Sequence, residues 1–306
     1  MRAVSYDSFA NDNSRLRVGV VPDPKVGPGQ VLIEVRAAGV NPVDWKVMAG
    51  GLDGMMDAVF PVVPGWDVAG VVRALGPDTP DFAPGDEVMS YARKDVIGAG
   101  TFAEYVTVSA DHVARKPAAL DWNQAGGLPL AGMTAQRALD RLDVGPADVL
   151  LVHAASGGVG SFAVQLGRDR GARVIGTASE ANHAYLRELG AEPVVYGDGL
   201  AGRVRDLAAD GVSAVADFAG GQLETTLSVL GPGGRHVSIT ESDVERHGGH
   251  WIWVRPDGAA LARLAALADR GALGVEVAGT FPLDQVGAAF DASRGGHTRG
   301  KLVIIP

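Results

Sequence analysis

The sequence of 306 residues contains no cysteine. This absence excludes disulfide bonds, catalysis by a thiolate, and every metal site that depends on cysteine ligands. Only seven histidines are present, and among them only His247 and His250 lie close together. The two glycines between them disfavour the helical turn that would bring both rings to one metal ion. We interpret this pair as part of a solvated loop.

Long apolar runs are also absent. No stretch approaches the length of a membrane span, and residues 1–13 lack the apolar core of a signal peptide. We therefore expect a cytoplasmic protein. The formal net charge of −9 makes a nucleic acid or an anionic membrane an unfavourable partner. The length allows two domains with separate cores, and no internal repeat or low-complexity tract is present.

One segment has the pattern of a dinucleotide site. Residues 150–160 (LLVHAASGGVG) lead an apolar strand into a glycine-rich turn, and apolar residues at helical spacing follow. The glycines allow a tight turn, and a helix after it would present free backbone N–H groups to a pyrophosphate. A second predicted strand at residues 172–177 completes the unit and makes the pattern specific. The alternative is a tight turn that binds no ligand.

The chain divides into two kinds of pattern. Short alternating apolar runs between glycines and prolines favour a mostly antiparallel β fold in the first third, at residues 31–36, 68–75, 87–91 and 102–108. From Asp121, a candidate N-cap, predicted helices and strands alternate to residue 239, which is typical of a doubly wound parallel sheet. A helix at residues 261–270 follows. We expect the apolar tail, residues 300–306, to form a strand that returns to the β domain.

Several ordered motifs resemble those of zinc-free medium-chain dehydrogenases/reductases, in the quinone oxidoreductase (ζ-crystallin-like) branch. The resemblance runs nearly from end to end. Its markers are GVNPVDWK at residues 39–46, PGWDVAG at 64–70, PGDEV at 84–88, GTFAEYV at 100–106, LPLAGMTA at 128–135, HAASGGVG at 153–160 and GKLV at 300–303.

The resemblance implies an α/β protein with a GroES-like β domain and a Rossmann domain built on a doubly wound parallel sheet. Residues 1–120 and 256–306 would form the catalytic domain that binds the substrate, and residues 121–255 would form the domain that binds NADPH. It also implies a homodimer, for which the last Rossmann strand offers a pairing edge.

The implied activity is NADPH-dependent hydride transfer, without metal, to quinones or other α,β-unsaturated carbonyl compounds. Zinc-dependent relatives carry a cysteine in the segment that matches residues 39–44, where this chain has Asn41. They also carry a His-Glu pair where this chain has Trp66 and Asp67. Without a Lewis acid to stabilise an alkoxide, reduction of an electron-poor acceptor is the chemistry that stays accessible.

The preference for NADPH over NADH rests on Ser179. NAD-preferring sites usually end the second strand with a carboxylate that binds the ribose 2′-OH. A neutral serine here can donate to a 2′-phosphate, although Glu180 follows it and His183 stands where relatives often carry a cation. Ser179 can also serve as a helix N-cap. Further cofactor contacts implied by the resemblance are Thr134, Ser156, Gly157, Gly158, Val159, Tyr196, Phe218, Ala219, Ser238 and Lys301.

The candidates for chemistry lie in the first domain. Asn41, Asp44 and Tyr91 carry groups that can hydrogen-bond or protonate a substrate oxygen. The alternatives are a turn role for Asn41, an N-cap role for Asp44 ahead of residues 45–48, and a core position for Tyr91. Trp45 and Trp66 can bind a flat acceptor by stacking, or pack in the core. No nucleophile–base arrangement is present, so the proton can also come from solvent.

Two other functions stay open. An enoyl-thioester reductase would need a basic entrance for a CoA or acyl-carrier tail, to which Lys46, Arg93 and Lys94 could contribute. A non-catalytic NADPH-binding sensor would keep the same fold. Turnover with thioesters alone would indicate the first, and binding of NADPH without turnover of any acceptor would indicate the second.

Overall fold

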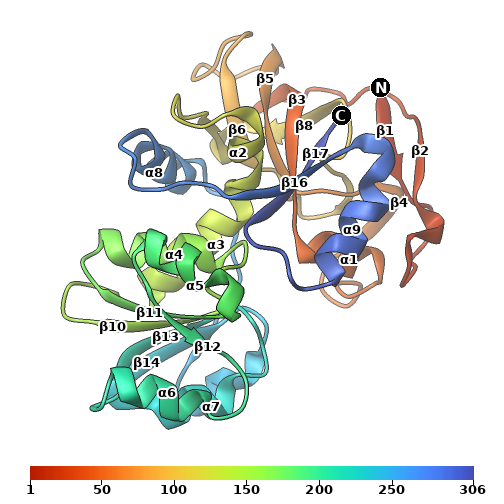
Figure 1. The fold of residues 1–306 in the computed structure, drawn as a ribbon. Coiled ribbons are helices and arrows are strands. Elements are labelled where there is room, and N and C mark those ends of the chain that lie inside the picture. The colour runs from red at the N-terminus through yellow and green to blue at the C-terminus, as the bar shows by residue number, and fades with distance from the viewer. The chain divides into compact units, whose positions relative to one another are not determined.

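The structure is a computed structural model that describes all of residues 1–306. The chain forms two units, Met1–Leu130 with Arg255–Pro306, and Ala131–Val254. Figure 1 shows strands and helices in both of them. The predicted α/β class, with a β-rich domain and a parallel-sheet domain, is confirmed. No helix combines the length and the apolar composition that a membrane crossing requires.

The first unit is built on a seven-stranded sheet in which most neighbouring strands are antiparallel. Its order is β16 (Val277–Pro282), β17 (Lys301–Ile305), β3 (Gln30–Val40), β5 (Asp67–Leu75), β6 (Glu87–Tyr91) and β9 (Val113–Arg115), with β8 (Tyr105–Ser109) also paired to β3. The expected return of the tail is confirmed, because β17 pairs with β3 and places Leu302 opposite Val40. Alternate residues of β3 are buried and form the core.

Smaller elements complete this unit. Two short two-stranded sheets pair β1 (Arg2–Ser5) with β2 (Arg17–Val20), and β4 (Ala58–Val63) with β7 (Ile97–Ala99). The helices that lie wholly in it are α1 (Pro42–Met48), α2 (Trp122–Gly127), α8 (Gly258–Asp269) and α9 (Val286–Arg294). The predicted N-cap Asp121 is confirmed, since its carboxylate accepts from the backbone N–H of Gln124 at 2.8 Å.

The second unit contains a six-stranded, wholly parallel sheet. Its order is β12 (Glu192–Val195), β11 (Arg173–Ala178), β10 (Val149–His153), β13 (Val212–Asp217), β14 (Leu230–Ser238) and β15 (His250–Trp251). The connecting helices are α4 (Gly160–Asp169), α5 (His183–Leu189), α6 (Leu200–Leu207) and α7 (Leu223–Val229). Leu151, Ile175 and Val215, from three adjacent strands, are fully buried, as expected for a parallel sheet covered on both faces.

Helix α3 (Pro129–Arg141) begins in the first unit and continues in the second. The pattern after Asp121 also predicts helices over residues 130–142 and 156–170 and a strand over residues 235–239. The first helix agrees with α3 to within one residue at each end. The second begins later, at Gly160, so that residues 156–159 belong to the turn, and the strand begins earlier, at Leu230.

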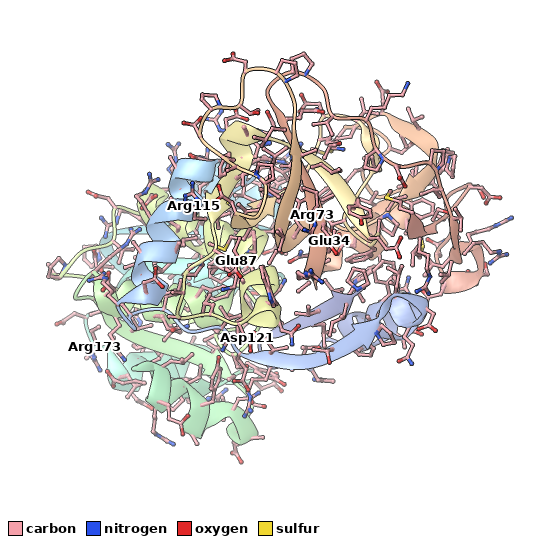
Figure 2. The ribbon with its side chains drawn as sticks, turned by 90° about the horizontal axis from the view of Figure 1, so that it is seen from above. Glu34, Arg73, Glu87, Arg115, Asp121 and Arg173 are labelled. Carbon is pink, nitrogen blue, oxygen red and sulfur yellow. The ribbon has the colours of Figure 1, made fainter.

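Ion pairs join some charged side chains on the surface of the first unit. Figure 2 shows Arg73 beside Glu34, and the two form an ion pair between neighbouring strands β5 and β3. Arg115 pairs with Asp86 at 2.9 Å. Such exposed pairs contribute roughly 0–1 kcal/mol each. The fold therefore depends on the buried sheets rather than on these contacts.

Candidate functional site

The glycine-rich turn follows β10 directly and is anchored to the neighbouring strand. Ala154 adopts a positive φ of 54°, and its carbonyl accepts from the N–H of Gly157 at 3.0 Å. Thr177 at the end of β11 holds the turn on both sides: its Oγ1 accepts from the N–H of Ala154 at 3.1 Å, and its carbonyl accepts from that of Ala155 at 2.9 Å. The turn is therefore held against β11 by hydrogen bonds to Thr177.

Gly160 explains the end of the glycine pattern. A Cβ at this position would lie 2.1 Å from the carbonyl oxygen of Ala154, so no other residue fits where α4 meets the turn. The side chains of Ser156 and Val159 are half-buried, as are Gly157 and Gly158. Backbone N–H groups at the start of a helix, next to glycines, are the chemistry that binds a pyrophosphate.

Ser179 follows the neighbouring strand β11. It precedes a short 3-10 helix at Glu180–Asn182, but its side chain makes no capping hydrogen bond, so the N-cap role is not used. Its Oγ accepts from Nδ2 of Asn182 at 3.3 Å. His183 begins α5, and its Nε2 is buried without a partner. Tyr196 follows β12 and is 52% exposed.

Asp217 at the end of β13 organises the next part of the same sheet edge. Its Oδ1 accepts from the N–H groups of Ala219 at 2.9 Å and Gly220 at 3.0 Å, which shapes the turn after Phe218. Its Oδ2 accepts from the hydroxyl of Ser238 at 2.9 Å. Ser238 is fully buried at the end of β14, so its hydroxyl is directed to Asp217.

His153 lies opposite Asp217 in the strand register. Its ring is 1% exposed and Nε2 has no partner. Burial lowers the pKa of His153 to about 4, with the charge of Asp217 opposing the shift, so the ring is neutral near pH 7. The sequence reasoning missed both residues, although His153 stands in the HAASGGVG motif.

The carboxyl ends of five parallel strands thus bring together most of the predicted cofactor residues. The turn at residues 156–159 follows β10, Ser179 follows β11, Tyr196 follows β12, Phe218 and Ala219 follow β13, and Ser238 ends β14. This edge is where open α/β sheets bind ligands. Thr134 is buried within α3. Lys301 is in β17, in the sheet of the first unit.

A buried polar cluster joins distant parts of the first unit. The Nζ of Lys301 donates to Oδ1 of Asn41 at 2.5 Å and to the carbonyl of Val40 at 2.9 Å. The amide Nδ2 of Asn41 donates to Oδ2 of Asp67 at 2.8 Å, and Oδ1 of Asp67 accepts from the N–H of Leu130 at 2.8 Å. The Asn41 amide therefore links an ammonium group to a carboxylate.

The charges of this cluster are set by burial and by their neighbours. Burial raises the pKa of Asp67 to about 6, while Lys301 and the hydrogen bonds from Asn41 and Leu130 hold it down, so Asp67 is ionised near pH 7. Burial lowers the pKa of Lys301, and Asp67 and Asp44 oppose that shift. Asp67 was not identified from the sequence as a site residue, because its partners are distant in the chain.

Asp44 does not cap α1 as the sequence suggested. The helix begins at Pro42, its N-cap is Asn41, and Asp44 is the third helical residue of a capping box. Its Oδ2 accepts from the backbone N–H of Asn41 at 2.7 Å, whereas Oδ1 is buried without a partner. Burial raises the pKa of Asp44 to about 8, with the charge of Asp67 adding to the shift. The carboxyl group thus keeps its proton near pH 7.

The three aromatic candidates are placed differently. Tyr91 is 1% exposed, and burial raises the pKa of its phenol. Trp66 packs on it, with ring centroids 6.2 Å apart. Trp45 lies on α1, and its Nε1 donates to Oγ of Ser293 at 3.1 Å on α9. The Arg294 guanidinium lies 5.5 Å from the centroid of the Trp45 ring, so this indole is engaged within the unit.

The two histidines of the predicted solvated loop belong to the second unit, and His247 is exposed whereas His250 is partly buried. His247 ends a 3-10 helix at Ser242–His247, and Gly248 follows with a φ of 79°. His250 is in the edge strand β15, where its Nδ1 lies 3.3 Å from a guanidinium nitrogen of Arg141. No group of three or more potential metal ligands occurs among residues 1–306.

Two family models match the chain. Residues 27–118 match the alcohol dehydrogenase GroES-like domain, and residues 189–304 match the model described as zinc-binding dehydrogenase.

Individual proteins match over nearly the whole chain. A chloroplastic quinone oxidoreductase from Triphysaria versicolor is 32% identical over 100% of this chain and 98% of its own length. A chloroplastic NADPH-dependent alkenal/one oxidoreductase from Arabidopsis thaliana is 34% identical over 100% of this chain and 80% of its own. The solved structure of the quinone oxidoreductase from Coxiella burnetii superposes with a TM-score of 0.88, at 33% identity, over 100% of this chain and 99% of that one.

Proposed function

The chain is an oxidoreductase of the medium-chain dehydrogenase/reductase family, in its quinone oxidoreductase branch, and we propose that it uses NADPH to reduce quinones or other α,β-unsaturated carbonyl compounds. The observation that carries the proposal is the fixed glycine turn between β10 and α4, with four further strand ends beside it. In this proposal the second unit binds the nucleotide, and the first supplies groups to the substrate.

The residues of the turn fit a dinucleotide. The backbone of residues 156–160 is free of bulky side chains at Gly157, Gly158 and Gly160, and the first N–H groups of α4 follow. These N–H groups would hold the pyrophosphate. Thr177 and Asp217 do not touch it in this proposal; they fix the turns that do. Phe218, Ala219 and Ser238 would lie along the bound nicotinamide half, and Thr134 would approach it from α3.

The proposed preference for NADPH rests on Ser179. Its hydroxyl accepts one hydrogen bond, from Asn182, and keeps its own hydrogen for a phosphate oxygen. No carboxylate stands at the position that would bind a ribose 2′-OH. His183 and Tyr196 would contact the adenosine half. Lys301 is bonded to Val40 and Asn41, so it would support the substrate-binding unit rather than the nucleotide.

Zinc does not fit the residues at the place where zinc-dependent relatives bind it. Zinc in proteins takes thiolate, imidazole or carboxylate ligands. Trp66 offers none of these, and both oxygens of Asp67 accept hydrogen bonds, from Leu130 and Asn41. The Asn41 amide oxygen accepts from the ammonium of Lys301. We therefore propose a metal-independent reaction, in which the ammonium of Lys301 supplies the positive charge at this place.

The chemistry divides between the cofactor and the chain. When bound, the nicotinamide supplies a hydride to an electron-poor carbon. The residues of the chain then exclude water, orient the acceptor and stabilise the negative charge that develops on its oxygen. Trp66 can support a flat acceptor by stacking. Asp44, which keeps its proton near pH 7, and Tyr91 are the groups that can donate to the acceptor's oxygen.

Fluorescence titration with NADPH and NADH, followed by absorbance assays with 1,4-benzoquinone, 9,10-phenanthrenequinone and crotonyl-CoA, tests the proposal. We expect tighter binding of NADPH and turnover of the quinones, unchanged by prior dialysis against a chelator. Turnover of the thioester alone would indicate an enoyl-thioester reductase. Binding of NADPH without turnover of any acceptor would indicate a non-catalytic sensor. Absence of nucleotide binding would exclude the cofactor itself.

The quaternary structure and location belong to the same proposal. We propose a cytoplasmic homodimer in which the edge strand β15 pairs with its copy. Sedimentation analysis of the wild type and of a variant with a proline in place of Trp251 checks the dimer, because proline removes a backbone donor from that edge.

A further inference from the structure

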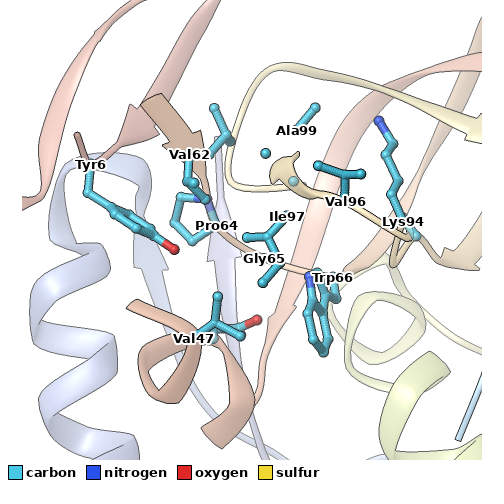
Figure 3. A pocket seen from close by; sticks show the side chains of 15 residues that line it. Tyr6, Val47, Val62, Pro64, Gly65, Trp66, Lys94, Val96, Ile97 and Ala99 are labelled. Atoms are coloured by element: carbon cyan, nitrogen blue, oxygen red, sulfur yellow. The ribbon is translucent and has the colours of Figure 1, made fainter. Parts of the chain in front are cut away.

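A small cavity lies within the first unit, between α1, the start of β5 and the β4–β7 sheet. It has a volume of about 20 Å³, enough for about one water-sized group. Val47, Val62, Ile97 and Trp66 form much of its apolar wall. Figure 3 shows the hydroxyl of Tyr6 directed toward the space between Pro64 and Val47, with Lys94 on the far side of the pocket.

Two of the residues that line this cavity carry a buried polar atom without a hydrogen-bond partner. The atoms are the hydroxyl of Tyr6 and Oδ1 of Asp44, from residues that are 1% and 3% exposed. Leaving such groups unpaired costs roughly 1–3 kcal/mol each. Two unpaired groups that line one cavity indicate that something else completes their hydrogen bonds.

The surroundings of Asp44 and Tyr6 determine whether each group donates or accepts a hydrogen bond. Oδ2 of Asp44 already accepts from the N–H of Asn41, so the proton that burial retains on this carboxyl resides on Oδ1. Burial raises the pKa of Tyr6, which therefore stays a neutral phenol. Both groups are therefore donors, and two donors suit one oxygen atom with two lone pairs.

We propose that Tyr6 and Asp44 together bind the carbonyl oxygen of the conjugated acceptor, and that Asp44 gives this oxygen its proton. The inference rests on the proposed function. Sequence reasoning singled out Asp44 but not Tyr6, which reaches the cavity because it pairs with Val62 in an isolated bridge. A single carbonyl oxygen is about the size of the space.

For an enone, a hydride adds to the β-carbon. The C=C π pair then forms a double bond between the α-carbon and the carbonyl carbon, and the C=O π pair moves onto oxygen. That oxygen takes the proton from Oδ1 of Asp44, and the resulting enol becomes the saturated ketone in water. For a quinone, the hydride adds to a ring carbon and the resulting enolate oxygen takes the same proton. The product becomes the hydroquinone in water, when the ring carbon loses a proton and the second oxygen gains one. Asp44 is reprotonated from solvent, so each turnover consumes one hydride and one proton.

The charges that face Asp44 come from several elements. Asp67 on β5 disfavours its ionised form, and Lys301 on β17 favours it. Tyr6 after β1 and Tyr91 on β6 are neutral phenols in its range. Loss of the Asp44 proton as pH rises through about 8 should therefore lower kcat, because the carboxylate can no longer donate.

The variants Tyr6→Phe and Asp44→Asn separate binding from proton transfer. Tyr6→Phe removes one donor and keeps the ring, whose contact with Phe60 at 6.1 Å between centroids is retained. We expect kcat/KM for cyclohex-2-enone and for 1,4-benzoquinone to fall by about 100-fold. Asp44→Asn can keep a donor at the same place but carries no acidic proton. We expect kcat to fall with little change in KM, and the decline above pH 8 to disappear.

A binding measurement without nucleotide gives a second readout. Calorimetry with cyclohex-2-enone should show weaker binding to Tyr6→Phe than to the wild type. Tyr105→Phe is the matched control, because it removes the same atom from β8, outside the cavity. Its kinetics should equal those of the wild type. The melting temperature of Tyr6→Phe should not fall, since the lost hydroxyl has no partner within the protein.

The outcomes distinguish this inference from the proposed function. If the wild type reduces the acceptors and Tyr6→Phe keeps full kcat/KM, the inference is overturned and the proposed function stands. A decline above pH 8 that persists in Asp44→Asn would remove Asp44 as the proton donor. If the wild type binds no NADPH or reduces no carbonyl acceptor, the proposed function itself fails.

Discussion

The Nζ of Lys301 lies 2.5 Å from Oδ1 of Asn41, which precedes it by 260 residues. This contact joins the end of the chain to the cap of α1, and through Asn41 it reaches the carboxylate of Asp67. The ammonium of Lys301 lies 4.0 Å from Oδ2 of Asp67, so a buried cation stands beside this buried carboxylate.

Replacement of Lys301 by methionine should destabilise the protein strongly. The side chain keeps its length, but the charge of Asp67 loses its compensating cation in a fully buried position. Breaking a buried pair in this way costs about 3–5 kcal/mol. Urea denaturation measures the change, with the exposed Lys25→Met as the control. A loss below about 1 kcal/mol would contradict the role of Lys301. Adding Asp67→Asn to Lys301→Met should restore part of the stability.

Stability should fall as pH rises from 6.5 to 8. The pKa of Asp44 is raised to about 8 in the folded protein, so the folded state binds a proton that the unfolded chain has released. Stability from this group is therefore lost as pH rises toward its folded pKa, by about 1 kcal/mol per pH unit. Buried His153, with a pKa of about 4, acts in the opposite direction at lower pH.

Denaturation of Asp44→Asn over the same range checks this prediction. The variant cannot titrate, so its stability should change less between pH 6.5 and 8 than that of the wild type. An equal slope in both proteins would show that Asp44 is ionised in the folded state.

Ser179→Asp should reverse the preference between the two nucleotides. A carboxylate after β11 would repel a 2′-phosphate and accept from a ribose 2′-OH. We expect NADPH binding to weaken by about tenfold or more, equal to ~1.4 kcal/mol, and NADH binding to improve. Fluorescence titration measures both constants. Ser228→Asp places the same charge on exposed α7 and should leave both unchanged.

Gly160→Ala should disrupt the nucleotide turn. Its Cβ would lie 2.1 Å from the carbonyl oxygen of Ala154, so either the turn or the start of α4 must shift. We expect a loss of about 1–3 kcal/mol in stability and weaker NADPH binding. Gly202→Ala in α6 is the control, since nothing lies within 4 Å of its Cβ and alanine favours a helix. Equal effects of the two changes on NADPH binding would refute the proposed role.

Local patterns in the sequence were enough to predict the alternating strands and helices of the second unit. The strand at Val149–His153 and the N-cap at Asp121 depend on neighbouring residues, and both were predicted at their observed positions. Helix α9 was not predicted, although Val286, Ala289 and Phe290 have helical spacing and are buried. Its signal was present and was missed.

The polar cluster and the cavity were beyond prediction for a physical reason. Asn41, Asp67 and Lys301 meet only because β17 pairs with β3 and β3 with β5. Likewise, no local pattern indicates that Tyr6 faces the same cavity as Asp44. Such contacts depend on strand order, and the chain sequence alone does not specify which distant strands pair.

The position of β17 between β16 and β3 has a consequence for synthesis on the ribosome. The unit Ala131–Val254 is contiguous and can fold once its own residues have emerged. The other unit cannot close its sheet until residues 301–305 are translated, so residues 38–40 of β3 stay unpaired on that side until then. An open strand edge invites aggregation, so the nascent chain should depend on chaperones until β17 has been translated.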